Sequence, residues 1–212
     1  QTVSEPERGF PSGPEWTTMS DSASEPGGFS ILFPPGWTRY FIDDEGRQAL
    51  TSRMSTQVRA LGRPDLDVEM RMLINQQWKQ LQTRRVGAVY LPESVAEDSA
   101  PIPMSFALIQ HRGRPGIDFE TTFRDMAPGP VEAFDTSVGR ILRTEADRRG
   151  KDEQAEVIGR QLDYGIPLPL PGDGRGMIIS ASITTLDDTD PALVAGLVEL
   201  SDTIVETYRW RS

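Results

Sequence analysis

The block of residues 162–210 constrains the fold more than any other segment, because two strand patterns, the turn between them and a capped helix follow one another directly. Every second residue from Ile158 to Ile166 falls on one side, and so do Ile179, Ala181 and Ile183, which is the period of half-buried strands. The connection over 167–176 holds three prolines, which cannot donate ladder hydrogen bonds, and three glycines, which tolerate positive φ. The block therefore predicts a β-hairpin.

A helix is predicted directly after this hairpin. Thr189 or Asp190 supplies an N-cap acceptor, and Pro191 suits the first helical position, where a missing N–H costs nothing. Large apolar residues recur at spacings of three and four from Leu193 to Tyr208, which makes a broad stripe that must be buried.

The rest of the chain is assigned from the same two periodicities. We predict strands over 29–33, 38–42, 48–54, 86–91, 104–111, 139–149 and 153–166, and helices over 64–85 and 116–126. In this interpretation 43–46 is a hairpin turn in which Gly46 adopts the unusual backbone angle. The strand over 104–111 carries apolar residues on both sides, so it is expected to be central.

These elements predict an α+β fold, an α/β/α sandwich with a central antiparallel β-sheet covered by helices. A parallel doubly wound fold fits poorly, because 137–185 offers three strands joined by short turns and no helix between them. We predict two parts: a polar N-terminal arm or linker over 1–28, rich in Ser, Glu, Pro and Gly, and one domain over 29–212.

Composition excludes several classes of function. The net charge is −10 and the pI about 4.7, which argues against nucleic acid and against an anionic membrane as a main partner. The chain has no cysteine and a single histidine, His111, so thiolate and multi-histidine metal sites are excluded, and we expect no cofactor. We expect His111 to be a surface or hydrogen-bonded residue.

The location of the protein stays open. No apolar run approaches the roughly 20 residues that cross a bilayer, so we expect no direct membrane insertion. The sequence starts at Gln1 followed by a polar arm, which suits an extracytoplasmic domain tethered to a surface and equally a trimmed cytoplasmic protein.

Two motifs carry a resemblance to a known family. The segment Phe-Ser-Ile-Leu-Phe-Pro-Pro-Gly-Trp at 29–37 resembles the opening of Mog1/PsbP-like domains, and 163–171 through Thr-Tyr-Arg-Trp at 207–210 resembles their closing strand, hairpin, strand and helix. Together they frame most of 25–212, and the chain is most similar to the actinobacterial uncharacterised, lipoprotein-like branch. The resemblance implies an α/β/α sandwich used for non-enzymatic binding, as in Ran-GTPase interaction by Mog1 and photosystem assembly by PsbP. Neither function carries over to individual residues here.

Other motifs have structural explanations. Gly172–Gly176 precedes a strand and lacks the phosphate-loop frame, so we interpret it as a turn. The acidic run 187–190 lacks the glycine and glutamate of a calcium loop and is interpreted as a helix cap. Four arginines of the predicted 139–166 hairpin, taken to share one side, are candidates for facing an acidic partner, although nearby acidic residues favour a salt-bridged surface. These candidates are Arg140, Arg143, Arg148 and Arg160.

Two hypotheses for function follow. The preferred one is a non-enzymatic protein-interaction or accessory module with a protein partner of unknown identity, surface-tethered in one version, which predicts an exposed apolar or charged patch on a sheet edge or on the arm. The alternative is a small-ligand carrier or hydrolase, which predicts a concave pocket lined by carboxylates such as Asp118, Glu120 or Asp163 with perturbed pKa values.

Overall fold

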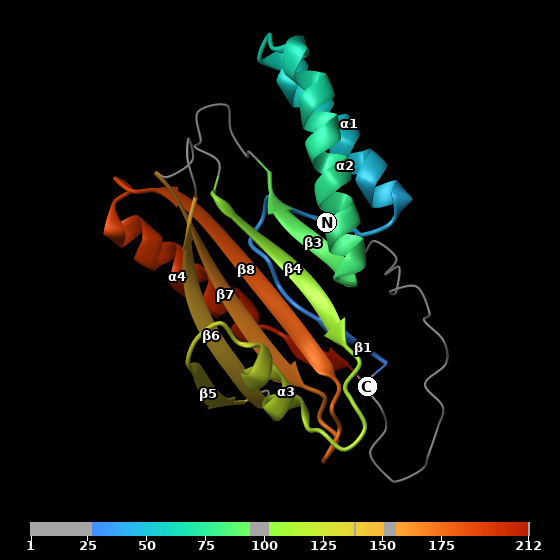
Figure 1. The fold of residues 1–212 in the computed structure, drawn as a ribbon, viewed down its shortest axis with the longest axis vertical. Coiled ribbons are helices and arrows are strands. Elements are labelled where there is room, and N and C mark those ends of the chain that lie inside the picture. Colours follow the sequence, from blue (N-terminus) through green and yellow to red (C-terminus); the bar gives the residue numbers. More distant parts are fainter. Residues whose placement is uncertain (1–26, 94–101, 138, 151–155, 212) are drawn as a thin grey trace, which may run out of the picture.

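The computed structural model describes residues 27–93, 102–137, 139–150 and 156–211 (Figure 1). The helices are α1 (Asp44–Ala60), α2 (Asp67–Thr83), α3 (Phe119–Met126) and α4 (Pro191–Glu206), with a 3-10 turn at Pro64–Leu66. The strands are β1 (Gly28–Ser30), β2 (Trp37–Phe41), β3 (Val86–Pro92), β4 (Met104–His111), β5 (Val131–Thr136), β6 (Gly139–Arg149), β7 (Val157–Pro167), β8 (Gly176–Leu186) and β9 (Arg209–Arg211).

The sheet is antiparallel throughout, which confirms the predicted fold class. Seven strands follow the order β2-β3-β4-β8-β7-β6-β5, and β1 pairs with β9 in a separate two-stranded sheet. The large sheet is two meanders, β2 to β4 and β5 to β8, that meet where β4 pairs with β8 from Met104↔Ile183 to His111↔Gly176. β4 is therefore central, as its apolar pattern predicts, and β2 and β5 are the edge strands.

Helices cover both faces of the sheet (Figure 1). On one face, α4 packs Leu197, Ile204 and Val205 into the main core, and Phe29 and Trp210 of the β1–β9 ribbon pack against the same core. On the opposite face, two smaller cores lie under α2 and α3. The α2 core contains Tyr40, Trp78, Val86 and Val89, and the α3 core contains Phe119, Phe123 and Leu142.

The C-terminal block folds as predicted. β7 and β8 form the expected hairpin, paired from Val157↔Leu186 to Pro167↔Gly176. The Asp190 carboxylate accepts a hydrogen bond from the backbone N–H of Ala192 at 2.9 Å and caps α4, whose first residue is Pro191.

The predicted hairpin over 38–54 is wrong, because residues 44–60 form helix α1. The Asp43 carboxylate accepts a hydrogen bond from the backbone N–H of Gly46 at 2.7 Å, which starts a helix rather than a turn. Gly46 does not supply a positive φ either. Its missing side chain gives clearance, since a Cβ built there would lie 2.0 Å from the carbonyl oxygen of Phe41. Leu50, Met54 and Val58 have the four-residue spacing that could have revealed this helix.

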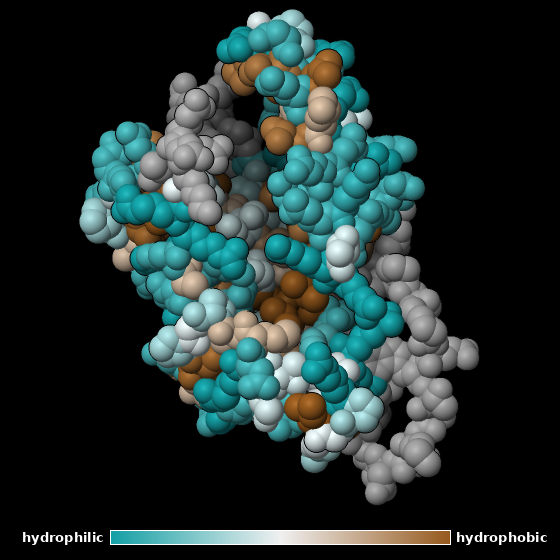
Figure 2. All heavy atoms as spheres, viewed as in Figure 1, coloured by the Kyte–Doolittle hydropathy of each residue, from teal (hydrophilic) through white to brown (hydrophobic). Residues whose placement is uncertain are grey.

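The surface in the view of Figure 2 is mostly hydrophilic, with apolar residues at its upper end, where α1 and α2 lie. The exposed apolar residues of this helix pair and its connection are Leu61, Val68, Met72 and Leu73. Within the described residues, every helix is too short or too polar to cross a membrane. The predicted arm over 1–28 lies outside the described residues except for its last two positions.

Candidate functional site

The four candidate arginines do not share one surface. Successive side chains of a strand point to opposite faces, so Arg140 and Arg148 of β6 lie on the α3 side of the sheet, and Arg143 lies on the α4 side. Arg160 is opposite Asp147 in the β6–β7 ladder and shares the α4 side with Arg143. The expected single arginine-rich side is therefore wrong, because Arg143 lies three positions after Arg140 in the same strand, and an odd offset places two side chains on opposite faces.

Three of these arginines are neutralised by neighbouring carboxylates. Arg140 contacts Glu120 at 3.0 Å and Asp135 at 3.1 Å, and Arg160 contacts Asp147 at 2.8 Å. Arg143 contacts Glu145 at 3.0 Å and Asp202 at 2.9 Å. Arg148 is exposed and has no ion pair within the described part of the chain. A partner-facing role for any of the four stays a prediction.

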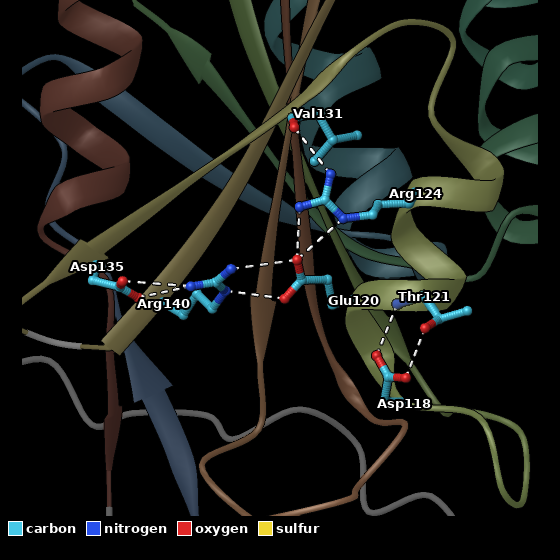
Figure 3. A network of polar contacts seen from close by, with 7 residues as sticks. All are labelled: Asp118, Glu120, Thr121, Arg124, Val131, Asp135 and Arg140. Atoms are coloured by element: carbon cyan, nitrogen blue, oxygen red, sulfur yellow. Dashed lines mark hydrogen bonds and ion pairs between the residues drawn. The ribbon is translucent and has the colours of Figure 1, made fainter.

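Glu120 lies at the centre of a surface network beside α3 (Figure 3). Its carboxylate accepts hydrogen bonds from Arg124 at 2.7 Å and from Arg140 at 3.0 Å, so the two guanidinium groups hold the pKa of Glu120 below its ordinary value. Arg124 also donates to the backbone carbonyl of Val131, and thereby links α3 to β5. Glu120 is thus an ionised structural group at neutral pH.

The other two carboxylates named above also have structural partners. Asp118 caps α3 by accepting from the Thr121 backbone N–H at 2.8 Å and from its hydroxyl at 2.7 Å, and these hydrogen bonds lower the pKa of Asp118. Asp163 lies on β7 and accepts from Ser180 at 2.5 Å and from Gln161 at 2.9 Å. Asp118 and Glu120 both belong to the start of α3, whereas Asp163 is held within the sheet.

A pocket of about 230 Å³ opens between edge strand β5 and helix α4. Its walls come from alternate residues of β5, from β6 and β7, and from the last turns of α4. The lining residues are Glu132, Phe134, Thr136, Ile141, Arg143, Tyr164, Asp202, Val205 and Glu206. Arg143 is the one sequence-predicted residue that lines it.

The base of this pocket is a closed polar cluster. Tyr164 is 2% exposed, and its hydroxyl donates to Asp202 at 2.5 Å and lies 2.9 Å from the hydroxyl of Ser201. Arg143 donates to Asp202 at 2.9 Å and to Glu145 at 3.0 Å. Burial alone would lower the pKa of Arg143, but Asp202 and Glu145 outweigh it and the pKa is raised. Burial and then Asp202 raise the pKa of Tyr164, so both groups stay protonated.

The rim of the pocket is acidic and aromatic. Phe134 is 45% exposed although it faces the pocket. Glu132 and Glu206 are exposed, and within the described residues neither carboxylate has a hydrogen bond or an ion pair. The Arg209 guanidinium near the end of α4 donates to the backbone carbonyls of Glu206 and Tyr208 rather than to the Glu206 carboxylate.

Sequence reasoning missed most of this pocket because it assigned no strand to 131–136. The available signal was that Glu132, Phe134 and Thr136 fall on one side if the segment is extended. Because only one of these three residues is apolar, the sequence pattern cannot be told from that of a loop. Asp202 and Glu206 lie on the predicted helix, four residues apart, but nothing local shows that this side of the helix faces β5.

A second depression, of about 410 Å³, lies between α1 and α2 and contains Arg47 and Arg71. Arg47 donates to Asn75 at 2.9 Å and to Asp44 at 3.1 Å. Arg71 donates to Ser55 at 2.8 Å and to Asp67 at 3.1 Å. Because both cations already have acceptors, this depression is a weaker candidate than the pocket beside β5. The described residues contain no group of three or more His, Asp or Glu side chains placed to hold a metal ion.

Comparison with known proteins assigns no family. No protein-family model matches the chain, and no curated protein matches it. Among solved structures, the chain is similar to LpqN, a protein involved in cell envelope biogenesis of Mycobacterium tuberculosis, with 12% sequence identity and a TM-score of 0.39. That similarity covers 89% of this chain and 85% of LpqN. These comparisons do not confirm the resemblance to Mog1/PsbP-like domains.

His111 is half-buried at the end of β4, with its ring edge-on to Phe119 at 5.8 Å, rather than on an open surface. Its buried Nε2 has no hydrogen-bond partner among the described residues. Burial first, and then the charge of Arg114, lower the pKa of His111 below its ordinary value.

This lowered pKa predicts a loss of stability in mild acid. The unfolded chain takes up a proton near pH 6.5, before the folded chain does, so the free energy of unfolding should fall as the pH drops from above 6.5 toward the lower folded pKa. Urea unfolding between pH 7.5 and 5.5 should show this slope in the wild type and a smaller slope in His111→Gln. Because the chain has one histidine, equal slopes in both proteins would show that the pKa of His111 is not lowered in the folded protein.

Proposed function

We propose that the protein is a non-enzymatic interaction module that binds a protein partner at the pocket between β5 and α4. One observation carries this proposal: an edge strand of the sheet places a half-exposed aromatic ring, Phe134, beside two carboxylates that have no described partner. Aromatic residues at exposed concave positions are common anchors of protein interfaces, and sheet edges are common sites of strand addition.

The contacts of the remaining carboxylates favour this proposal over a hydrolase. A catalytic carboxylate pair needs two groups that converge on a substrate and differ in pKa. Asp118 instead caps a helix, Glu120 is bridged by two arginines, and Asp163 accepts from two side chains of the sheet. The resemblance of 29–37 and 163–171 to Mog1/PsbP-like domains, a family used for binding, also supports an accessory role.

Site-specific photo-crosslinking in the source organism tests the proposal. We expect p-benzoylphenylalanine in place of Phe134 to give a discrete adduct with another protein, because the substituted ring keeps the position that faces the pocket. The same amino acid at Leu193, which is 52% exposed at the other end of α4, is the matched control and should give no such adduct. Absence of an adduct at 134, or the same adducts from both positions, would refute the proposal.

A further inference from the structure

The pocket beside β5 has an excess of negative charge. Among its lining residues, the three carboxylates of Glu132, Asp202 and Glu206 face one cation, Arg143, which gives a formal balance of −2. Arg143 and Tyr164 already bind Asp202. The carboxylates without a described ion pair are therefore at the rim: Glu132, which is opposite Arg143 in the β5–β6 ladder, and Glu206. Such a rim favours a cationic ligand and disfavours an anionic one.

The size and apolar surface of the pocket suit one long side chain. Its volume of about 230 Å³ lies below the roughly 300–1,000 Å³ of sites for drug-sized ligands. Phe134, Ile141 and Val205 supply apolar contact for an alkyl stem, and the exposed ring of Phe134 can stack against a cationic head group. The side chains with this combination of stem and charge are lysine and arginine.

The neighbouring sheet edge can present such a side chain. β5 pairs with β6 on one side, and no described strand lies on its other side. An extended peptide that adds to this edge gains main-chain hydrogen bonds, and its alternate side chains fall on the pocket face beside Glu132, Phe134 and Thr136.

Pairing of this edge with a second copy of the same chain is disfavoured by charge. Antiparallel pairing of two copies would bring the two Glu132 side chains close together on the same face of the extended sheet, and neighbouring like charges destabilise a strand pair. A basic partner segment is complementary to Glu132.

Resting on the proposed function, we propose that the partner contributes an extended, basic segment that pairs with the free edge of β5 and inserts a lysine or arginine side chain into the pocket. The partner chemistry is thus a basic strand, recognised by the Glu132–Glu206 rim, the Phe134 ring and the backbone of β5.

Two synthetic peptides test this inference on the full chain. One is a nine-residue peptide of alternating threonine and lysine, and the other carries glutamate in place of every lysine. In spectra of ¹⁵N-labelled protein, we expect the lysine peptide to shift the backbone amide signals of 131–136 and 202–206, with weaker binding at higher salt. We expect no shifts from the glutamate peptide.

Rim variants provide the matched comparison. The double variant Glu132→Gln with Glu206→Gln should weaken binding of the lysine peptide by about tenfold, since both rim carboxylates that attract the peptide lose their charge. Glu199→Gln, an exposed α4 substitution outside the pocket, should leave binding unchanged. The same spectra report whether each variant is folded.

The other outcomes separate this inference from the proposed function. Equal binding of both peptides at β5 would overturn the proposed preference for a basic segment, whereas strand addition at the edge of β5 would still be supported. Shifts confined to other surfaces, no binding at all, or an unchanged affinity in the double variant would overturn the inference. A crosslinked partner at position 134 would still support the interaction module in each of these cases.

Discussion

Replacing Trp78 with alanine should lower the free energy of unfolding by about 3–5 kcal/mol, the range for removing a large buried aromatic side chain. Trp78 is 2% exposed and packs with Tyr40, Val86 and Val89, which attaches α2 to the sheet. Its indole N–H also donates to the carbonyl oxygen of Asp43 at 2.9 Å, at the start of α1. One side chain therefore joins both helices of the pair to β2 and β3.

Urea unfolding would measure this loss, with Leu73→Ala as the control. Leu73 lies on the same helix but is 59% exposed, so its removal should change the free energy of unfolding by no more than about 0.5 kcal/mol. Trp78→Phe should fall between the two, because it keeps an aromatic ring and loses the hydrogen bond to Asp43. Equal losses for Trp78→Ala and Leu73→Ala would show that Trp78 is not part of a buried core under α2.

Replacing Gly46 with alanine is expected to destabilise the protein although Gly46 lies in a helix. Helix propensity alone favours alanine over glycine by about 1 kcal/mol. The added Cβ would lie 2.0 Å from the Phe41 carbonyl oxygen, and a backbone atom cannot move aside as a flexible side chain does. Relief requires a shift of the β2–α1 junction, so we expect a net loss of about 1–3 kcal/mol, the usual cost of overpacking.

Gly196→Ala is the matched comparison, because it makes the same chemical change within another helix. No atom lies within 4 Å of a Cβ built at Gly196, an exposed position of α4. Alanine there should raise the free energy of unfolding by about 0.5–1 kcal/mol. Opposite signs for the two variants, measured by urea unfolding, are the expected result, and a stabilised Gly46→Ala protein would contradict the close approach of Gly46 to the Phe41 carbonyl.

Local sequence signals predicted the elements whose boundaries are set by neighbouring residues. Pro191 and Asp190 start α4, and the prolines and glycines of 167–176 form the turn between β7 and β8. α1 was missed because Asp43, two more acidic residues and Gly46 resemble a turn, and only the contact of Gly46 with Phe41 shows why a glycine is needed there. β5 was missed because an edge strand with mostly exposed residues carries little apolar alternation.

The candidate site was less predictable because it joins distant parts of the chain. The separation of Arg140 from Arg143 onto opposite faces follows from strand geometry and could have been derived from their spacing. The ion-pair partners of these two arginines could not be derived in this way, because Glu120 comes from α3 and Asp202 from α4. Only the tertiary packing brings these carboxylates to β6.

The pairing of β4 with β8 determines whether the two halves of the chain share one interior. Met104, Phe106 and Leu108 of β4 enter the main core only because they are paired with Ile183, Ala181 and Ile179 of β8, respectively. A slip of one residue would turn all three side chains toward the opposite face and would bring Ser105, Ala107 and Ile109 into the main core in their place. Each half of the sheet has its own strand pairings, but the alignment of β4 with β8 decides which face of one half continues which face of the other.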